Sequence, residues 1–318
     1  MNYSAVIPTY RRKDDLIKCV ENLLAQTIKP SEVIISGVST DEETKEAFKI
    51  LKGKYPEFNI KLVLSDRRGI SVGRNKGLEA ASCEFVLMVD DDVELPPDFA
   101  EKALEILVKE GVYILTGIEQ RKMVVHRLQN LFRKIFFLDY YEPNKQLVLQ
   151  SGAKVIPSVV NTDIKAQYLG SHVWMMRRFL IEKVKFDERM ALYSHREDQD
   201  FSYTVFKIYG PVLLITPRLT FIHHHSAGGR VNFAQFQHIY VYNLTLNYVK
   251  HFLRVKGTKI IFAWSMMGLI LQSLHHSLKN SQISIFVETF NAVFRVINNW
   301  RSIALNKFDK IYGIFHKK

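Results

Sequence analysis

The strongest constraint on the fold is an alternation of short apolar segments with amphipathic ones over the first 115 residues. The segments with strand character are residues 3–7, 32–36, 60–64 and 84–89. The segments with helical periodicity between them are residues 14–26, 42–52 and 69–81. Alternation of this kind predicts an open, mostly parallel α/β sheet of Rossmann-like type, with helices on both faces. In such sheets ligands bind at the carboxyl ends of the strands.

Positive charge is concentrated at the C-terminal end. The chain has 44 Lys and Arg against 32 Asp and Glu, and residues 230–318 hold twelve of the former and two of the latter. Aromatic and aliphatic residues are interspersed with these charges. We therefore predict a catalytic domain over residues 1–230 and a helical region over residues 231–318 that contacts something anionic, either nucleic acid or a membrane surface.

An anionic membrane surface is the partner that we favour. Residues 260–278 carry no charge, but polar residues in the second half, among them Gln272 and His275, argue against a membrane span. Amphipathic helices at the interface are expected, with the basic segment 121–138 as a second contact. The alternative is that the helices pack on the catalytic domain. Residues 1–8 lack a signal peptide, so we expect a cytoplasmic protein, peripheral on the cytoplasmic face of the membrane.

Three consecutive acids, Asp90, Asp91 and Asp92, follow the strand at 84–89. Carboxylates at close range repel one another and so raise one another's pKa. A divalent cation such as Mg²⁺ or Mn²⁺ bound between them removes this repulsion. In an extended segment Asp90 and Asp92 share a face, and Asp91 points toward the sheet or a ribose. The alternative is a solvated turn in which Asp92 caps a helix.

Acids and histidines gather again near the end of the predicted catalytic domain. Glu197, Asp198 and Asp200 precede a helix over 201–209, where acids also complement the helix dipole. His223 and His225 share a face of the strand over 213–225, from which they reach a metal or phosphate. Surface histidines at a strand end are the alternative.

In this order and spacing, these features resemble the family 2 glycosyltransferases of GT-A fold. The resemblance covers roughly residues 3–230, and the block that contains the acidic triplet is the most specific. The matching segments are VIPTYRR (6–12), EVIISGVSTD (32–41), GISVGRNKGLEAASCEFVLMVDDDVELPPDF (69–99), GSHVWMMRR (170–178), FDERM (186–190), REDQDFSYTVFKIYG (196–210) and LTFIHHHSAGGR (219–230).

The resemblance implies a role for each matching residue. The implied metal ligands are Asp90, Asp92 and His223, and the implied nucleotide-binding residues are Pro8, Thr9, Tyr10, Arg12, Asp41, Arg74, Asn75, Asp90 and Asp91. Asp198 is similar to the general base, with its neighbour Glu197 as the alternative. Gly170, Ser171 and Trp174 resemble the segment bordering the donor sugar and acceptor. By this resemblance Trp174 stacks on a sugar ring. The alternative is that Trp174 is an aromatic residue of the core.

The activity so implied is metal-dependent, inverting transfer of a sugar from a UDP, GDP or dTDP donor to a hydroxyl of a glycan or lipid-linked glycan. In the family an acidic residue that recognises the nucleobase of the donor usually follows the second strand. Here Ser36, Gly37 and Val38 occupy these positions, so the identity of the nucleobase is left open. Asp41 is an acidic residue close to these positions, but its presence is equally explained by a role as the N-cap of the next helix.

Two other functions remain as alternatives. The first is a nucleotidyltransferase on a similar sheet, whose phosphate loop would be Arg11 to Lys13. The second is a non-catalytic nucleic-acid-binding module, which leaves the acidic clusters without a role. We therefore expect no nucleic acid partner.

Overall fold

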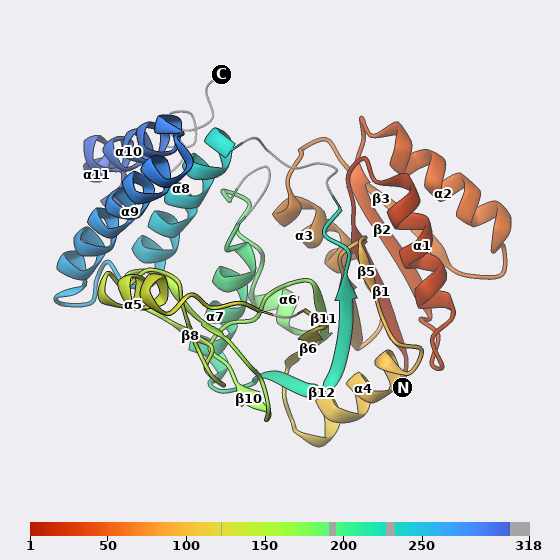
Figure 1. Ribbon diagram of the computed structural model, residues 1–318. Coiled ribbons are helices and arrows are strands. Elements are labelled where there is room, and N and C mark those ends of the chain that lie inside the picture. Colours follow the sequence, from red (N-terminus) through yellow and green to blue (C-terminus); the bar gives the residue numbers. More distant parts are fainter. Residues whose placement is uncertain (122, 191–194, 227–232, 306–318) are drawn as a thin grey trace. The chain divides into compact units, whose positions relative to one another are not determined.

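The computed structural model describes residues 1–121, 123–190, 195–226 and 233–305. Contacts divide the chain into two units (Figure 1). The first consists of residues 1–122, 160–192 and 197–230, and the second of 123–159, 193–196 and 231–318. Residues 123–159 therefore group with the C-terminal helices, whereas we had expected them in the catalytic domain. The predicted boundary at residue 230 and the predicted helical segment 306–318 lie outside the described residues.

A mixed, mostly parallel sheet forms the first unit. Among the described residues its strand order is β10-β12-β6-β11-β4-β1-β2-β3, and β5 pairs with β12. The strands are β1 (Tyr3–Pro8), β2 (Glu32–Val38), β3 (Ile60–Ser65), β4 (Phe85–Val89), β5 (Val93–Glu94), β6 (Ile114–Glu119), β10 (Ile164–Lys165), β11 (Val173–Arg177) and β12 (Leu213–His223). β1 is parallel to both β2 and β4, and β11 runs antiparallel between β4 and β6. The predicted fold class is confirmed.

Helices cover both faces of this sheet, as its sequence pattern predicts. Successive side chains of β1 point to opposite faces, so Ala5 and Ile7 belong to one buried cluster and Val6 to another. The first cluster includes residues of α1 (Lys13–Leu24), α2 (Glu42–Lys54) and α4 (Phe99–Lys109). The second includes residues of α3 (Ile70–Ala80), α6 (Leu180–Lys183) and α7 (Glu197–Tyr209). This arrangement leaves the carboxyl ends of the strands to the connecting loops.

The second unit combines helices with short strands. The helices are α5 (Arg127–Ile135), α8 (Phe233–His251), α9 (Thr258–Asn280), α10 (Ile283–Asn298) and α11 (Trp300–Ala304). A three-stranded sheet is made of β7 (Tyr140–Glu142), β9 (Lys154–Pro157) and β8 (Leu147–Val148). Within the described residues, no helix combines the length and the hydrophobicity that a membrane span requires.

Close packing holds α5 against α9. A side chain at Gly268 would place its Cβ 2.4 Å from Cβ of Phe136, so the position has room only for glycine. The Phe136 ring stacks on Trp264 at 4.8 Å between centroids, and the indole nitrogen of Trp264 donates to the carbonyl of Ile135 at 2.9 Å. These contacts fix the C-terminal end of α5 to α9, while Leu128 and Leu131 of α5 are exposed.

Candidate active site

The acidic triplet lies in a turn that connects β4 to β5. The prediction of an extended segment is wrong, because the chain must reverse here so that Val93 of β5 can pair with His223 of β12. The amide of Asp90 donates to the carbonyl of His172 at 2.9 Å, and the amide of Val93 donates to the carbonyl of Asp90 at 3.3 Å. The turn sends the three carboxylates to different partners.

Asp92 is held as a carboxylate by its hydrogen bonds and by the charge of Arg12. Its Oδ1 lies 3.0 Å from Nε2 of His223, and its Oδ2 lies 3.2 Å from the guanidinium of Arg12. The amide of Ser226 also donates to Oδ2, at 2.9 Å. Burial alone would raise the pKa of Asp92, but the hydrogen bond and charge of His223, with Arg12, lower it to about 2. Asp92 is therefore ionised at neutral pH.

Asp91 binds the loop that follows β1. Its carboxylate accepts a hydrogen bond from Thr9 Oγ1 at 2.7 Å and from Arg12 at 2.8 Å. Burial raises the pKa of Asp91 to about 6, and Arg12 and Thr9 offset only part of this effect. Thr9 and Arg12 were predicted as nucleotide-binding residues, and here they fix the acidic turn. Pro8 ends β1, and the ring of Tyr10 lies 4.2 Å from the guanidinium of Arg68.

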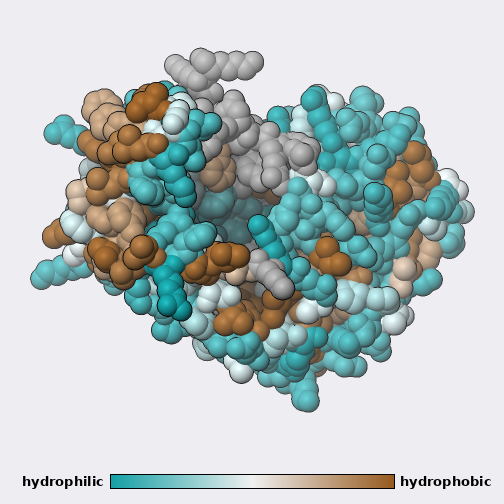
Figure 2. Space-filling model, viewed as in Figure 1, coloured by the Kyte–Doolittle hydropathy of each residue, from teal (hydrophilic) through white to brown (hydrophobic). Residues whose placement is uncertain are grey.

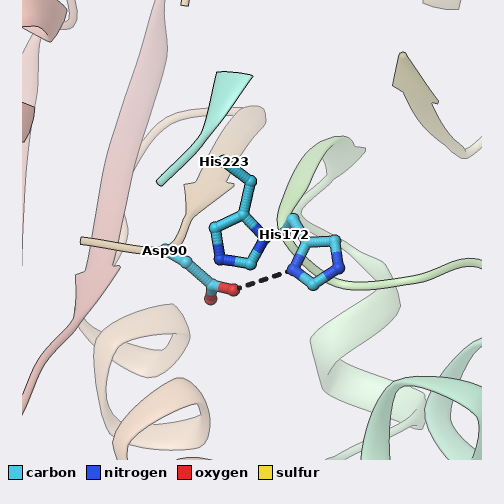
Figure 3. A group of neighbouring side chains, drawn as sticks. All are labelled: Asp90, His172 and His223. Carbon is cyan, nitrogen blue, oxygen red and sulfur yellow. Dashed lines mark hydrogen bonds and ion pairs between the residues drawn. The ribbon is translucent and has the colours of Figure 1, made fainter. Parts of the chain in front are cut away.

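Asp90 belongs to a group with two histidines. Figure 3 shows the side chains of Asp90, His172 and His223 converging from three different segments. Their candidate ligand atoms all lie within 4.8 Å of one another, and Nδ1 of His172 lies 3.3 Å from Oδ2 of Asp90. Sequence reasoning missed His172, although it directly follows Gly170 and Ser171 in a matching segment. Only the fold brings it beside His223.

This donor set suits a divalent metal ion. Two imidazoles and a carboxylate bind Mn²⁺ and neighbouring transition metals, and Asp92 adds a second carboxylate beside His223. Nδ1 of His223 is buried and has no hydrogen-bond partner. A second group, Glu119 with His223 and His225, meets the same distance criterion, as the shared face of the two histidines predicts. The predicted ligands Asp90, Asp92 and His223 therefore lie close together.

Arg74 connects the two acidic clusters. Its guanidinium lies 3.1 Å from Oδ1 of Asp90 and 2.6 Å from Oε1 of Glu197, and it is almost fully buried. Burial alone would raise the pKa of Asp90, but the hydrogen bond with His172 and the charge of Arg74 lower it. Burial raises the pKa of Glu197, Asp198 adds to this, and Arg74 opposes it. Arg74 thus pairs with carboxylates of both clusters, and its contact with the nucleotide stays a prediction.

Asp198 occupies the first turn of α7 and is only half-buried. Its Oδ1 accepts a hydrogen bond from the amide of Gln199 at 2.7 Å. A Cβ at Gly170 would lie 4.0 Å from its Oδ2, so the predicted sugar-binding segment does border Asp198. Glu197 is engaged by Arg74, and the role of Asp198 as the general base stays a prediction.

Trp174 is a core residue, and its prediction as a sugar-stacking residue is wrong. Its side chain is fully buried and stacks on Phe186 at 5.9 Å between ring centroids. Its indole nitrogen donates to the carbonyl of Gly170 at 2.5 Å. Strand alternation in β11 turns Trp174 toward the interior. Ser171 is also buried, and Gly170 lies beside Asp198.

The side chains of Asn75 and Asp41, both predicted to contact the nucleotide, make hydrogen bonds within the protein. The side-chain nitrogen of Asn75 donates to the carbonyl of Phe186 at 3.0 Å, and its side-chain oxygen accepts from the backbone amide of Phe186 at 2.9 Å. Asp41 is the N-cap of α2, where its carboxylate accepts hydrogen bonds from the amide and hydroxyl of Thr44. It also accepts from the amide of Arg11 at 2.7 Å. Both side chains are already satisfied by the protein.

Comparison with known sequences places this site in a family. Residues 4–184, more than half of the chain, match the family described as Glycosyl transferase family 2. The chain belongs to this family. As a family 2 glycosyltransferase it is an enzyme, and its sheet and helices match those of GT-A transferase structures.

Its curated relatives include bacterial glycosyltransferases. The uncharacterized glycosyltransferase YibD of Escherichia coli is 32% identical over 34% of this chain, which spans 31% of that protein. The amylovoran biosynthesis glycosyltransferase AmsB of Erwinia amylovora is 24% identical over 70% of each chain. The GalNAc(5)-diNAcBac-PP-undecaprenol beta-1,3-glucosyltransferase of Campylobacter jejuni is 32% identical over 29% of this chain and 30% of its own.

A solved structure shares the fold. The mannosyltransferase PcManGT of Pyrobaculum calidifontis, in complex with GDP-Man and Mn²⁺, has a TM-score of 0.52 at 16% identity. The comparison covers 99% of this chain and 81% of that one.

Proposed function

We propose that this enzyme transfers a sugar from a nucleoside diphosphate donor to a hydroxyl of a glycan or lipid-linked glycan, with inversion and with a divalent ion. The observation that carries the proposal is the junction made by Arg74, which holds Asp90 of the acidic turn and Glu197 beside Asp198. The relative named for a PP-undecaprenol substrate and the structure holding GDP-Man and Mn²⁺ support it.

Asp90, Asp92, His172 and His223 would hold the metal ion. When bound, such an ion neutralises the negative charge of the departing diphosphate. The protein itself supplies the fixed positions: Arg12 pairs with Asp91 and Asp92, and Arg74 pairs with Asp90. These ion pairs keep the carboxylates ionised and oriented before the donor binds.

Asp198 accepts the proton of the acceptor hydroxyl in this proposal. The hydroxyl oxygen forms a bond to the anomeric carbon as the bond from that carbon to the diphosphate oxygen breaks. The electron pair of the broken bond leaves with the diphosphate, and the proton passes to Asp198. A single in-line displacement inverts the configuration of the anomeric carbon.

Donor binding tests the proposal directly. UDP-, GDP-, dTDP- and CMP-sugars are each added with Mn²⁺ or with EDTA, and the melting temperature is recorded. We expect one donor class to raise it by several degrees with Mn²⁺ only, because a ligand at a hundred times its Kd stabilises the folded state by about 2.7 kcal/mol. Asp92→Ala should abolish this shift, since it removes a carboxylate that contacts His223.

The control for this experiment is Asp98→Ala, which removes an exposed carboxylate a few residues away. It should retain the full Mn²⁺-dependent shift. A donor that stabilises the wild-type protein equally in EDTA, or that still stabilises Asp92→Ala, would contradict the metal-dependent proposal.

The second part of the proposal is a contact between the second unit and an anionic membrane surface. Exposed apolar residues lie on three helices, most of them three or four positions apart, and Figure 2 shows hydrophobic side chains over these helices. They are Leu128, Leu131 and Ile135 of α5, Ile260, Trp264, Met267, Leu271 and Leu278 of α9, and Ile283, Val287, Phe290, Phe294 and Ile297 of α10. The net charge of +10 beyond residue 229 complements anionic lipid.

Sedimentation with phosphatidylglycerol vesicles at low salt tests this contact. The wild-type protein should pellet with the vesicles, and Leu128→Glu with Leu131→Glu should lower the partition coefficient at least tenfold, because burying each leucine contributes about 1.5–3 kcal/mol. Ile50→Glu with Val108→Glu, which alters exposed apolar residues of the first unit, is the control and should bind normally. Wild-type protein that stays in the supernatant, or equal loss in both double variants, refutes the contact.

A further inference from the structure

The second unit contains a cavity of about 520 Å³ that no role described so far uses. This volume lies within the usual range of small-molecule sites and far exceeds what one bound ion needs. Its walls come from α5, the segment 138–141, β9, His195, α8, α9 and α10. The cavity therefore lies entirely within one unit of the protein.

The described residues that line the cavity include more cations than acids. Asp139 is the one acid among them, and it pairs inside the wall with the guanidinium of Arg196 at 2.7 Å. Asp139 also accepts from the backbone amide of Lys154 at 2.9 Å and from the hydroxyl of Tyr240. Arg133 and Lys154 line the cavity as well, so its described lining has a net positive charge, which favours an anionic occupant.

The guanidinium of Arg133 is held in place by a neutral amide and not by a carboxylate. The side-chain oxygen of Gln272, oriented toward α5, accepts hydrogen bonds from Nη2 of Arg133 at 2.9 Å and from Nε at 3.2 Å. No carboxylate of the described residues forms an ion pair with this guanidinium. A guanidinium has five N–H donors, so those of Nη1 remain for a ligand. Phosphate oxygens match this geometry well.

The remaining walls are apolar or carry neutral donors and acceptors. Leu138, Ile156, Phe236, Leu269 and Ile285 contribute apolar surface, and the amides and hydroxyls come from Gln237, Gln272, Asn280, Ser273 and Thr289. α5 gives Arg133 to the cavity and carries Leu128 and Leu131 on its exposed side. One helix thus links the charged cavity to the apolar surface.

We propose that this cavity binds the phosphate group of a lipid, with Arg133 and Lys154 as its recognition residues. The phosphate of an anionic phospholipid and the pyrophosphate of a lipid-linked glycan share this chemistry. The inference rests on the membrane part of the proposed function and extends it from a surface contact to a specific site. In this arrangement the leucines of α5 enter the membrane while the cavity behind the helix holds a headgroup.

Titration calorimetry in EDTA, without any nucleotide-sugar, tests the site on the full chain. The probes are geranyl pyrophosphate, dihexanoyl phosphatidylglycerol, inorganic pyrophosphate and geraniol. We expect one of the two phosphorylated lipids to bind, and Arg133→Gln to weaken its binding at least tenfold. Lys154→Gln is a second variant, should Arg133→Gln lower the melting temperature. Arg127→Gln makes the same charge change at an exposed position of α5 outside the cavity and should bind within twofold of wild type.

The four probes distinguish a membrane phospholipid from a lipid-linked glycan, and they also show which results would contradict the proposal. Preference for geranyl pyrophosphate identifies a lipid-linked acceptor, and preference for phosphatidylglycerol identifies a membrane lipid. Binding of inorganic pyrophosphate alone, equal effects of Arg133→Gln and Arg127→Gln, or wild-type binding in both cavity variants overturns the proposal. So does loss of binding in Asp92→Ala, which would place the ligand in the donor site. Because the assay needs neither metal nor donor, failure of sugar transfer does not alter its result.

Discussion

Asp198→Asn is expected to lower the rate of sugar transfer by about 10²- to 10⁴-fold, the usual contribution of a general base. The substitution keeps the size of the side chain and removes its ability to take the proton of the acceptor hydroxyl. Donor binding should persist, because the candidate metal ligands and Arg12 belong to other segments. The measurement is a single-turnover transfer assay, paired with the Mn²⁺-dependent melting shift.

Asp14→Asn is the matched control, because Asp14 is an acid in the first turn of α1, as Asp198 is in the first turn of α7, and its side chain is exposed. Its transfer rate should equal that of wild type. Loss of donor binding together with transfer in Asp198→Asn would show that Asp198 serves the donor site. Near-normal transfer would assign the base to another residue, with Glu197 next in line.

Arg74→Met is expected to lower the free energy of unfolding by about 3–5 kcal/mol, the cost of removing one partner from a buried ion pair. The methionine fills much of the volume but leaves Asp90 and Glu197 without their shared cation. Urea unfolding measures the loss. Arg67→Met removes an exposed arginine that pairs with Glu188, and this control should change stability by less than about 1 kcal/mol.

The loss in Arg74→Met should also depend on pH. Burial already raises the pKa of Glu197 above its ordinary value of 4.5. Without the guanidinium that pKa rises further, so the folded state retains a proton that the unfolded state releases above about pH 4.5. Stability of the variant relative to wild type therefore falls as pH rises from 5 to 8. A loss that stays constant over this range would mean that packing, not charge, accounts for it.

The order of strands and helices in the first unit followed from the sequence, because burial on both faces imposes a pattern that local residues must satisfy. β1, β2, β3 and β4 lie where Val- and Ile-rich segments predicted them. The candidate acids could also be predicted from the sequence. Carboxylates such as Asp90 and Asp92 repel one another, so their succession at the end of an apolar strand indicates a functional site. The short strands β7, β8 and β9 were not visible, since two to four residues are too few to show a period.

Roles that depend on neighbours distant in sequence could not be predicted. Trp174 and Asn75 were predicted as ligand contacts within matching segments. In the fold Trp174 is stacked on Phe186, and Asn75 forms hydrogen bonds with the backbone of Phe186. His172 gave no local signal, because only the pairing of β11 with β4 brings it beside Asp90.

Sequence by itself determined the α/β class and the residue types available for chemistry, because hydrophobic periodicity and charge are local properties. Tertiary structure alone decided how these residues combine. It turned the acidic triplet so that each carboxylate meets a different partner, buried Arg74 between two acidic clusters, and grouped residues 123–159 with the C-terminal helices around a cationic cavity. Such contacts join residues far apart in the chain, and their free energies depend on burial and distance, which only the folded chain defines.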